Sequence, residues 1–332
     1  MRTERVSFFS AGYRLVVVLH LPEASAGVRF PVLVHGPGWL EASCSTITEP
    51  FHEAFADAGY AVLHYQSRGN GESEGEPGWI RPFDQIEELS NAAMYAESRP
   101  ELDASRMGLF GLGGTGAGNA IYAAAFDQRI RCVIAQNVVA DGADWLRRMR
   151  REYEWKEFVQ RVRANQLRRV LENKDELVDP TEELMVATPE RKAAGMPTPG
   201  RIFHLGSAEA LLRYRPADVV HLISPRALLM TCIADDVVTP EHHARELYRR
   251  AGPPKRLVRQ TGAKVYEAYH QNFALLMSQF LEWCGRYLAP VPAAEVVEDD
   301  LGPGSGERAP ATEAMRARRI RRGSPADRGA TG

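Results

Sequence analysis

The sequence predicts an α/β protein with a mostly parallel, doubly wound sheet and a helical insertion, and two observations support this prediction. Apolar, β-rich runs alternate with helical patterns along most of the chain, which is typical of a parallel sheet covered by helices on both faces. A glycine-rich corner also joins an apolar run ending at Gly111 to an alanine-rich helix beginning near Gly116. This layout predicts a strand–turn–helix corner at the edge of the sheet.

The expected elements follow in order from the N-terminus. Two β-rich runs around a Ser-Ala-Gly turn predict a hairpin within residues 5–22. Periodicity predicts further strands at 30–36, 60–65, 107–110, 130–135, 226–233 and 255–259, and helices at 46–59, 79–97, 116–127, 240–251 and 266–288.

The pattern divides the chain into four segments. Residues 1–140 and 221–289 are predicted to form the first and second parts of the core. Residues 141–220 interrupt them as a helical cap insertion at the carboxyl end of the sheet. Residues 290–332 are rich in Pro, Gly, Ala, Arg and Glu without an apolar period, which predicts a disordered tail.

Composition excludes several classes of partner. The 332 residues carry a formal net charge of −2, so no strong field favours nucleic acid or a membrane surface, and a small-molecule substrate is expected instead. The four cysteines have no metal-knuckle spacing, and we expect neither a metal nor a cofactor. No signal-peptide stretch or long apolar run occurs, which predicts a cytoplasmic protein. The sequence leaves a homo-oligomer open.

Four motifs occur in an ordered series. They are His35-Gly36-Pro37-Gly38-Trp39, the Arg68–Gly75 segment with the pattern R-G-x-G-x-S, the corner at Gly111–Thr115, and Asp236 four residues before Pro240. On these motifs, residues 5–288 resemble the α/β-hydrolase superfamily, most closely its dienelactone-hydrolase-like and X-prolyl-dipeptidyl-peptidase-like esterase branch. The resemblance implies the α/β-hydrolase fold, an oxyanion or pocket loop at His35, Gly36 and Trp39, and a catalytic acid at Asp236.

Two catalytic positions of that family hold other residues here. Gly113 stands where the nucleophilic serine is expected, or Gly114 if the corner is counted back from the helix. The histidine position corresponds to Val265, which cannot relay a proton. Pro37 also lacks the N–H that an oxyanion loop would supply at that point. The nucleophile elbow is therefore predicted at Gly111, Gly113 and Gly114, with glycine at a left-handed apex.

Nearby side chains offer substitutes, each with a simpler alternative. Thr115 is a candidate nucleophile or a helix cap. His270 is a candidate displaced base oriented by Asp236, or an ordinary helix histidine. Tyr266 and Tyr269 are candidate hydroxyl donors lining the pocket, or core aromatics.

Other polar residues are interpreted more simply. Asp141 and Asp144 occupy a second position for a catalytic acid or begin a helix. His242 and His243 are adjacent on a predicted helix, where neighbouring side chains point apart, so a shared metal is not expected.

Three functions fit these residues. The first is hydrolysis of an ester, lactone, amide or C–C bond of a small organic substrate, using Thr115 or an activated water. The second is a lyase, cyclase or isomerase that uses the same pocket. The third is a pseudoenzyme that binds a small ligand, because a fold fixes the pocket but not the reaction.

Overall fold

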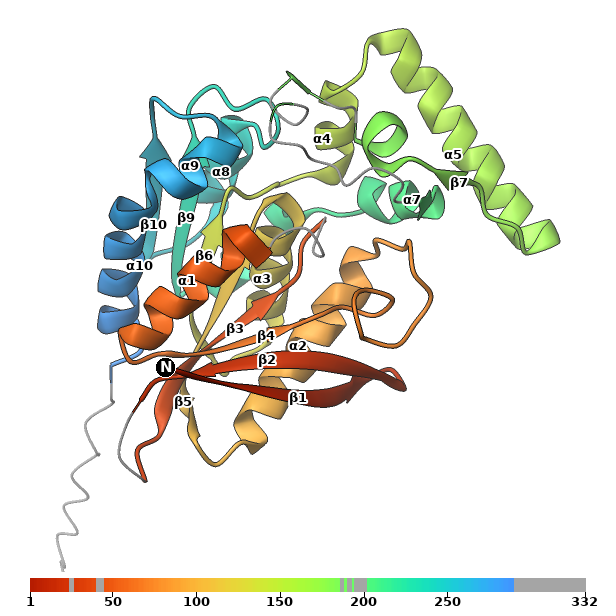
Figure 1. Cartoon of the computed structure of the whole chain (residues 1–332). Helices are drawn as coiled ribbons and strands as arrows, with labels where there is room; N and C mark the ends of the chain where they lie inside the picture. The colour runs from red at the N-terminus through yellow and green to blue at the C-terminus, as the bar shows by residue number, and fades with distance from the viewer. Residues whose placement is uncertain (24–26, 40–44, 186–187, 190–192, 194–201, 290–332) are drawn as a thin grey trace, which may run out of the picture. The chain divides into compact units, whose positions relative to one another are not determined.

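An eight-stranded sheet lies at the centre of the structure, a computed structural model that describes residues 1–23, 27–39, 45–185, 188–189, 193 and 202–289. The strand order is β1-β2-β4-β3-β5-β6-β9-β10 (Figure 1). The predicted hairpin is present, and its second strand pairs antiparallel with β4, whereas the remaining pairs are parallel. The strands are β1 (Arg2–Ser10), β2 (Tyr13–Leu21), β3 (Phe30–Gly36), β4 (Ala61–Tyr65), β5 (Leu102–Leu112), β6 (Ile130–Gln136), β9 (Ala227–Ile233) and β10 (Lys255–Gln260).

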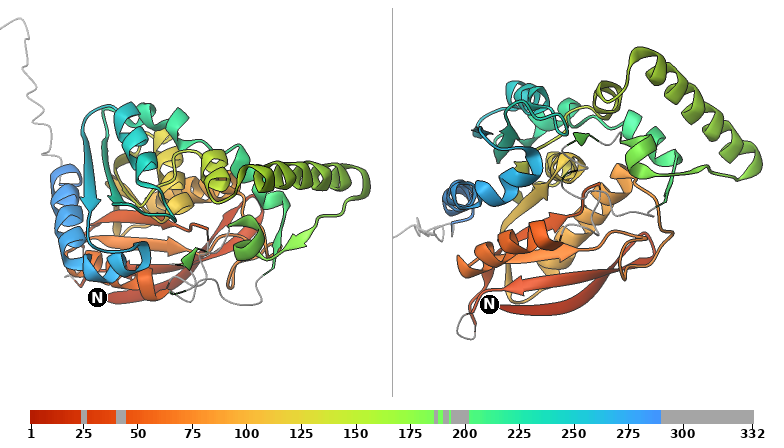
Figure 2. Two further views of the ribbon diagram at one scale, coloured as in Figure 1. Left: turned by 90° about the horizontal axis from the view of Figure 1, so that it is seen from above. Right: turned by 45° about the horizontal axis from the view of Figure 1, so that its top comes forward.

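Helices cover both faces of this sheet, as the alternating pattern predicted (Figures 1 and 2). α2 (Pro82–Ser98), α3 (Gly114–Phe126) and α8 (Glu241–Arg250) contribute to one hydrophobic core. α1 (Ser45–Asp57) and the C-terminal helices contribute to the core on the other face. α3 is buried along most of its length because its glycines and alanines let it lie close to the strands.

The predicted C-terminal helix is divided into two. α9 (Val265–Gln271) ends at Asn272, and α10 (Phe273–Tyr287) begins directly after it. The Asn272 side chain donates a hydrogen bond to Oε1 of Gln260 at 3.1 Å, which ties the break to the end of β10. A single long helix over 266–288 was therefore a wrong prediction, because a tertiary contact interrupts it.

The insertion between β6 and β9 has its own small core, which includes Trp39 of the loop after β3. It combines helices with a two-stranded antiparallel sheet, so it is less uniformly helical than predicted. Its elements are α4 (Gly142–Arg148), α5 (Glu152–Glu172), β7 (Leu177–Val178), the π-helical turn η2 (Pro180–Leu184), β8 (Phe203–His204), α7 (Gly206–Leu212) and the 3₁₀ turns η3 (Pro216–Asp218) and η4 (Val220–Ile223).

Residues Met1–Pro290 form one compact unit. The predicted tail over 290–332 lies outside the described residues. None of the helices within the described ranges is both long and apolar enough to cross a bilayer.

Candidate active site at the elbow

The turn between β5 and α3 has the backbone geometry of an elbow with Gly113 at its apex. Gly113 has φ +74° and ψ 168°, a conformation that side-chain-bearing residues rarely adopt. A Cβ placed on Gly113 would meet no atom of the described residues within 4 Å, its two chain neighbours aside, whereas one on Gly114 would lie 2.8 Å from Cγ2 of Val139. The open position above the corner therefore belongs to Gly113, and Gly114 is the first residue of α3.

Thr115 is the hydroxyl nearest the apex in sequence, but its side chain points into the protein. It is fully buried, and Oγ1 has no hydrogen-bond partner among the described residues. The helix cap that we considered for Thr115 is wrong, because Gly113 is the N-cap and Thr115 is the second residue of α3. The structure thus brings no described hydroxyl to the position of a family nucleophile.

The loop after β3 packs directly on this corner. A Cβ on Gly38 would lie 3.0 Å from the backbone nitrogen of Gly116, so the loop and α3 approach at backbone distance. Trp39 is buried and meets Trp145 of α4 edge to face, with ring centroids 5.9 Å apart. His35, the penultimate residue of β3, contacts Phe110 of β5 and other histidines described below.

The loop after β9 places Asp236 close to the elbow. Its Oδ1 accepts the N–H of Val238 at 2.8 Å, and its Oδ2 accepts the Thr239 hydroxyl at 2.5 Å. Cγ2 of Thr239 lies 3.4 Å from the Cβ position of Gly114. One side chain therefore separates the carboxylate of Asp236 from the corner, and two hydrogen bonds fix its orientation.

Three neighbouring parallel strands are each followed closely by a residue with positive φ. Gly113 follows β5, Asn137 follows β6 with φ +58°, and Asp235 follows β9 after one further residue with φ +56°. Left-handed backbone at non-glycine residues costs free energy and concentrates at functional edges of proteins. The shared positive φ marks the carboxyl edge of β5, β6 and β9 as the candidate active site.

The predicted substitutes for the base lie on α9. His270 is exposed, and no contact among the described residues joins it to Asp236. Tyr269 is buried in the core beneath α9, and Tyr266 is partly buried against the same core. The proton relay proposed for His270 and the pocket role proposed for the tyrosines remain predictions.

Four histidines gather instead on the opposite half of the sheet. They come from β2, β3, α1 and β4, and ring centroids of contacting pairs lie 4.8–5.1 Å apart. Nδ1 of His35 and Nε2 of His52 are 2.6 Å apart. Burial is the main cause that lowers the pKa of each ring, for His64 to about 4. Charge on neighbouring rings lowers the pKa of His35, His52 and His64 further, whereas Glu49 opposes the shift at His20. The cluster consists of His20, His35, His52 and His64.

A second polar cluster has the spacing of metal ligands. Atoms of Asp144, His242 and His243 lie within 4.8 Å of one another. However, Nδ1 of His243 accepts the N–H of Ala140 at 2.8 Å, so its neutral ring carries the proton on Nε2, which faces Asp144 at 3.1 Å. Metal-binding histidines have the reverse arrangement. Arg148 also donates to the same carboxylate oxygen at 2.6 Å. We therefore assign Asp144, His242 and His243 as a hydrogen-bonded cluster that joins α4 to α8.

The prediction that His242 and His243 point apart was wrong. Both Nε2 atoms contact Oδ2 of Asp144, at 3.0 and 3.1 Å, and the ring centroids are 4.3 Å apart. Adjacent helical side chains leave the axis in different directions, but two imidazoles are long enough to converge on a partner that lies between those directions. Asp141 has the simpler of its predicted roles, since its side chain caps the start of α4.

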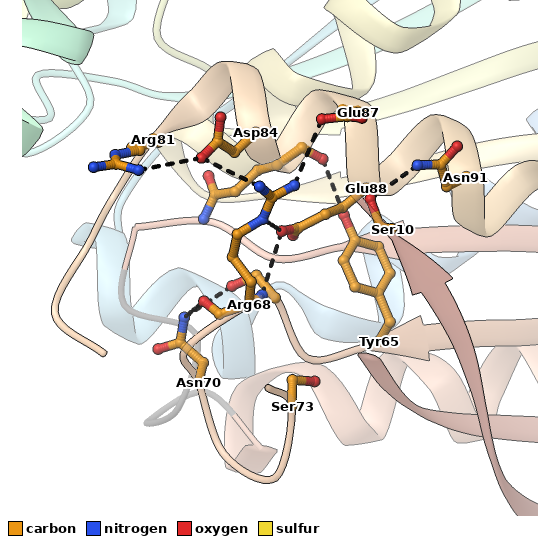
Figure 3. Close-up of polar contacts among 12 residues, drawn as sticks. Ser10, Tyr65, Arg68, Asn70, Ser73, Arg81, Asp84, Glu87, Glu88 and Asn91 are labelled. Carbon is orange, nitrogen blue, oxygen red and sulfur yellow. Dashed lines mark hydrogen bonds and ion pairs between the residues drawn. The ribbon is translucent and has the colours of Figure 1, made fainter. Parts of the chain in front are cut away.

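The R-G-x-G-x-S segment is anchored by a buried ion pair (Figure 3). Nε of Arg68 donates to Oε1 of Glu88 at 2.5 Å, and its other nitrogens lie 3.5 Å from Asp84 and 3.6 Å from Glu87. Burial raises the pKa of Glu88 to about 7, while Arg68 opposes that shift. The Ser73 hydroxyl donates to the Gln66 carbonyl at 2.6 Å. These contacts fix the loop in place and give its serine a structural role.

The same helix continues a polar connection to the elbow. Gln85, one turn before Glu88, accepts a hydrogen bond from Asn119 of α3 at 3.0 Å. The Tyr214 hydroxyl lies 3.0 Å from Oδ1 of Asn119 and 3.1 Å from the carbonyl of Thr115. All of these groups are buried except the partly exposed side chain of Arg68. Their hydrogen bonds hold α3, and with it the elbow apex, against α2 and the insertion.

Comparisons with known proteins agree with this geometry. The sequence profile of the S15 family, X-Pro dipeptidyl-peptidase, matches residues 11–263. The chain belongs to that family of α/β hydrolases. Its fold resembles the crystal structure of the α/β hydrolase GrgF from Penicillium sp. sh18, with a TM-score of 0.75 at 20% identity over 87% of this chain and 100% of that one.

Two sequence relatives extend the comparison. The chain is 26% identical over 266 residues to an uncharacterized 31.7 kDa protein of Escherichia coli, covering 78% of this chain and 91% of that protein. It is 36% identical over 126 residues to the thiohydrolase aneE of Aspergillus aculeatus, covering 37% of each.

Sequence reasoning missed the residues that support the corner. Gln85, Asn119 and Tyr214 carry no motif, and Tyr214 lies 99 residues from Thr115 in the chain. The only local signal is Gly118, where a Cβ would lie 2.2 Å from the Tyr214 hydroxyl. A glycine inside a helix lowers its stability, so it often marks a place where another group packs against the helix backbone. Gly118 could therefore have indicated a close contact at this point of α3.

Proposed function

We propose that this protein hydrolyses a small ester, thioester or lactone with a water molecule in place of the serine hydroxyl, so that no acyl-enzyme forms. The observation that carries the proposal is the open space at Gly113, where no atom from elsewhere in the described part of the chain lies within 4 Å of the Cβ position. Membership of a hydrolase family and similarity to a protein named thiohydrolase support the substrate class.

The chemistry requires one base and one group of donors. The water oxygen attacks the carbonyl carbon while its proton passes to the Thr239 hydroxyl, which lies between the corner and Asp236 and gives its own proton to the Asp236 carboxylate. The carbon–oxygen or carbon–sulfur bond then breaks, and the departing oxygen or sulfur takes the proton back from Asp236 through the same hydroxyl. Backbone N–H groups at the start of α3 stabilise the negative oxygen, because the first N–H groups of a helix have no partner within it.

Turnover of p-nitrophenyl acetate, a thioester and a lactone panel tests this proposal, with rapid-quench mass spectrometry of the intact protein. We expect turnover without an acyl adduct, full activity in Thr115→Val, and loss of activity in Asp236→Asn. Asp235→Asn is the matched control, since Asp235 is adjacent but exposed. An accumulating acyl adduct, or loss of activity in Thr115→Val, would contradict the proposal.

A second candidate function is binding of a small carbonyl compound without turnover. The position of the family histidine is occupied by Val265, and His270 is exposed, which favours this alternative. Calorimetry with the same panel distinguishes the two. Saturable binding together with no product in the wild-type protein would identify a binding protein and reject the hydrolase.

A further inference from the structure

Asn137 is the first residue beyond β6 and lies beside the elbow apex. Leu112 of β5 pairs with Gln136 of β6 in parallel register, and the N–H of Gly113 donates to the Gln136 carbonyl at 2.9 Å. Gly113 and Asn137 are therefore the next residues along two neighbouring strands (Figure 1). Neighbouring strands lie about 4.8 Å apart, a gap that an asparagine side chain and one hydrogen bond can span.

Thr231 of β9 fixes the side chain of Asn137. The backbone N–H of Asn137 donates to the Thr231 carbonyl at 3.1 Å and to Oγ1 of Thr231 at 3.2 Å. Oγ1 in turn donates to Oδ1 of Asn137 at 3.1 Å. Asparagine is one of the few residues that tolerate the φ of +58° found here. Because Thr231 is itself fully buried, these contacts hold the amide group of Asn137 in one orientation.

The nitrogen end of that amide group has no partner. Asn137 is 1% exposed, and its Nδ2 makes no hydrogen bond within the described part of the chain. Oδ1 and Nδ2 diverge from Cγ, so the contact of Oδ1 with Thr231 on the β9 side turns Nδ2 away from β9 and towards β5, on the other side of β6. The open position at Gly113 follows β5. Native proteins rarely bury an N–H donor that no water, ligand or reaction uses.

We propose that Asn137 positions the attacking water of the reaction proposed above, an inference that rests on that proposed function. Nδ2 donates a hydrogen bond to the water oxygen, while the water donates to the Thr239 hydroxyl that leads to Asp236. The strand order β5-β6-β9 places Asn137 between Gly113 and the loop that carries Asp236. The second lone pair of the water oxygen remains for attack on the carbonyl carbon.

A role limited to joining β6 and β9 is the alternative. That link uses only Oδ1 and the backbone N–H of Asn137, so Nδ2 contributes nothing to it. Loss of the link lowers stability and leaves the turnover of the folded protein unchanged. Loss of a group that holds the water lowers kcat and leaves KM nearly unchanged, because the substrate itself does not contact the amide.

Steady-state kinetics of Asn137→Gly with p-nitrophenyl acetate, the thioester and the lactone panel tests the inference. Glycine adopts positive φ without strain, so this variant removes the amide with little change to the turn. We expect kcat to fall about tenfold to a hundredfold at unchanged KM. Asn173→Gly is the matched control, since Asn173 is an exposed asparagine with φ +54° after α5. Its kcat should equal that of the wild-type protein.

Thr231→Val separates the amide from its support. Valine keeps the shape of threonine without the hydroxyl, so Oδ1 of Asn137 loses its donor while Nδ2 remains. We expect a smaller fall in kcat than in Asn137→Gly, again at unchanged KM. Circular dichroism establishes that each variant is folded. If Asn137→Gly does not fold, an unchanged kcat in Thr231→Val overturns the inference.

The possible results separate this inference from the function on which it rests. A fall in kcat confined to the Asn137 and Thr231 variants supports the inference. An active wild-type protein whose kcat is retained in folded Asn137→Gly overturns the inference and leaves the proposed function standing. A raised KM at unchanged kcat also overturns it, because the amide would then bind substrate rather than water. A wild-type protein that turns over no member of the panel refutes the proposed function, and the positioning role falls with it.

Discussion

The two halves of the sheet differ in where they hold groups that can transfer protons. The half built from β2, β3 and β4 holds four clustered histidines, three of them buried, whose pKa values are all lowered. The half built from β5, β6 and β9 forms the elbow, where Gly113 carries no side chain and Asp236 is the oriented carboxylate.

This difference shows why residue type alone does not identify a catalytic base. His35 belongs to a motif that the resemblance assigns to the oxyanion loop, yet it is 3% exposed and contacts His52. A base must reach the substrate and accept a proton near neutral pH. Burial opposes both abilities at His35, so the reaction proposed above would depend on the elbow instead.

The largest expected effect is on stability at acidic pH. His64 and His243 have pKa values of about 4 in the folded protein, against 6.5 for an unperturbed histidine. The unfolded chain therefore binds protons that the folded one excludes. The contribution of each neutral histidine to the free energy of unfolding is fully present above pH 6.5 and is lost as the pH falls towards 4. At pH 5 the loss is about 2 kcal/mol per histidine. His35 and His52 shift in the same direction.

Urea titrations at pH 7.5 and pH 5 measure this loss. His64→Phe should reduce the difference between the two conditions. An equal free energy of unfolding at both pH values would mean that the cluster does not stay neutral, and the contrast between the two halves would then fail.

Gly118→Ala should be the next largest effect. Alanine normally stabilises a helix by up to about 1 kcal/mol over glycine. Here the added Cβ would lie 2.2 Å from the Tyr214 hydroxyl and 2.9 Å from Pro216, so we expect a net destabilisation of about 1–3 kcal/mol. Thermal denaturation measures the sign. A stabilised variant would show that the support of α3 is looser than the structure indicates.

Gly113→Ser sharpens the comparison by restoring a hydroxyl to the elbow half. The site has room for the side chain, so the cost should be the left-handed backbone alone, about 1–2 kcal/mol. Without an imidazole, the serine should not react with a fluorophosphonate probe. The double variant Gly113→Ser, Val265→His should react. Labelling of the single variant would show that another base already reaches the apex.

His270→Gln should have the smallest effect. His270 is exposed on α9, so the expected change in stability is below about 0.5 kcal/mol and turnover of the substrate panel should be unchanged. Loss of turnover together with unchanged folding would support His270 as a displaced base. The elbow half of the sheet would then also have a histidine that transfers protons.

Much of the fold was predictable because its signals are local. The hairpin, the alternation of strands with helices and the glycine at the left-handed apex each follow from neighbouring residues. The predicted elbow strand at 107–110 was too short, since β5 spans Leu102–Leu112. The division at Asn272 was not predictable, because the hydrogen bond to Gln260 depends on the final position of β10.

The candidate site was predictable only in part. The order of motifs predicted the corner between β5 and α3 and the loop after β9 that carries Asp236, and the catalytic roles of these segments stay predictions. Sequence could not show that the Thr115 hydroxyl points inward, since that direction depends on how α3 packs. It also could not show that one aspartate, Asp144, draws His242 and His243 together.

By itself, the sequence determined the succession of strands and helices and the glycines that join β5 to α3, because these are properties of residues along the chain. Only the tertiary structure decided which polar groups are buried, which reach the corner and which face solvent. The physical reason is that burial and hydrogen bonding join residues distant in sequence, and these contacts set both the pKa and the reach of a side chain.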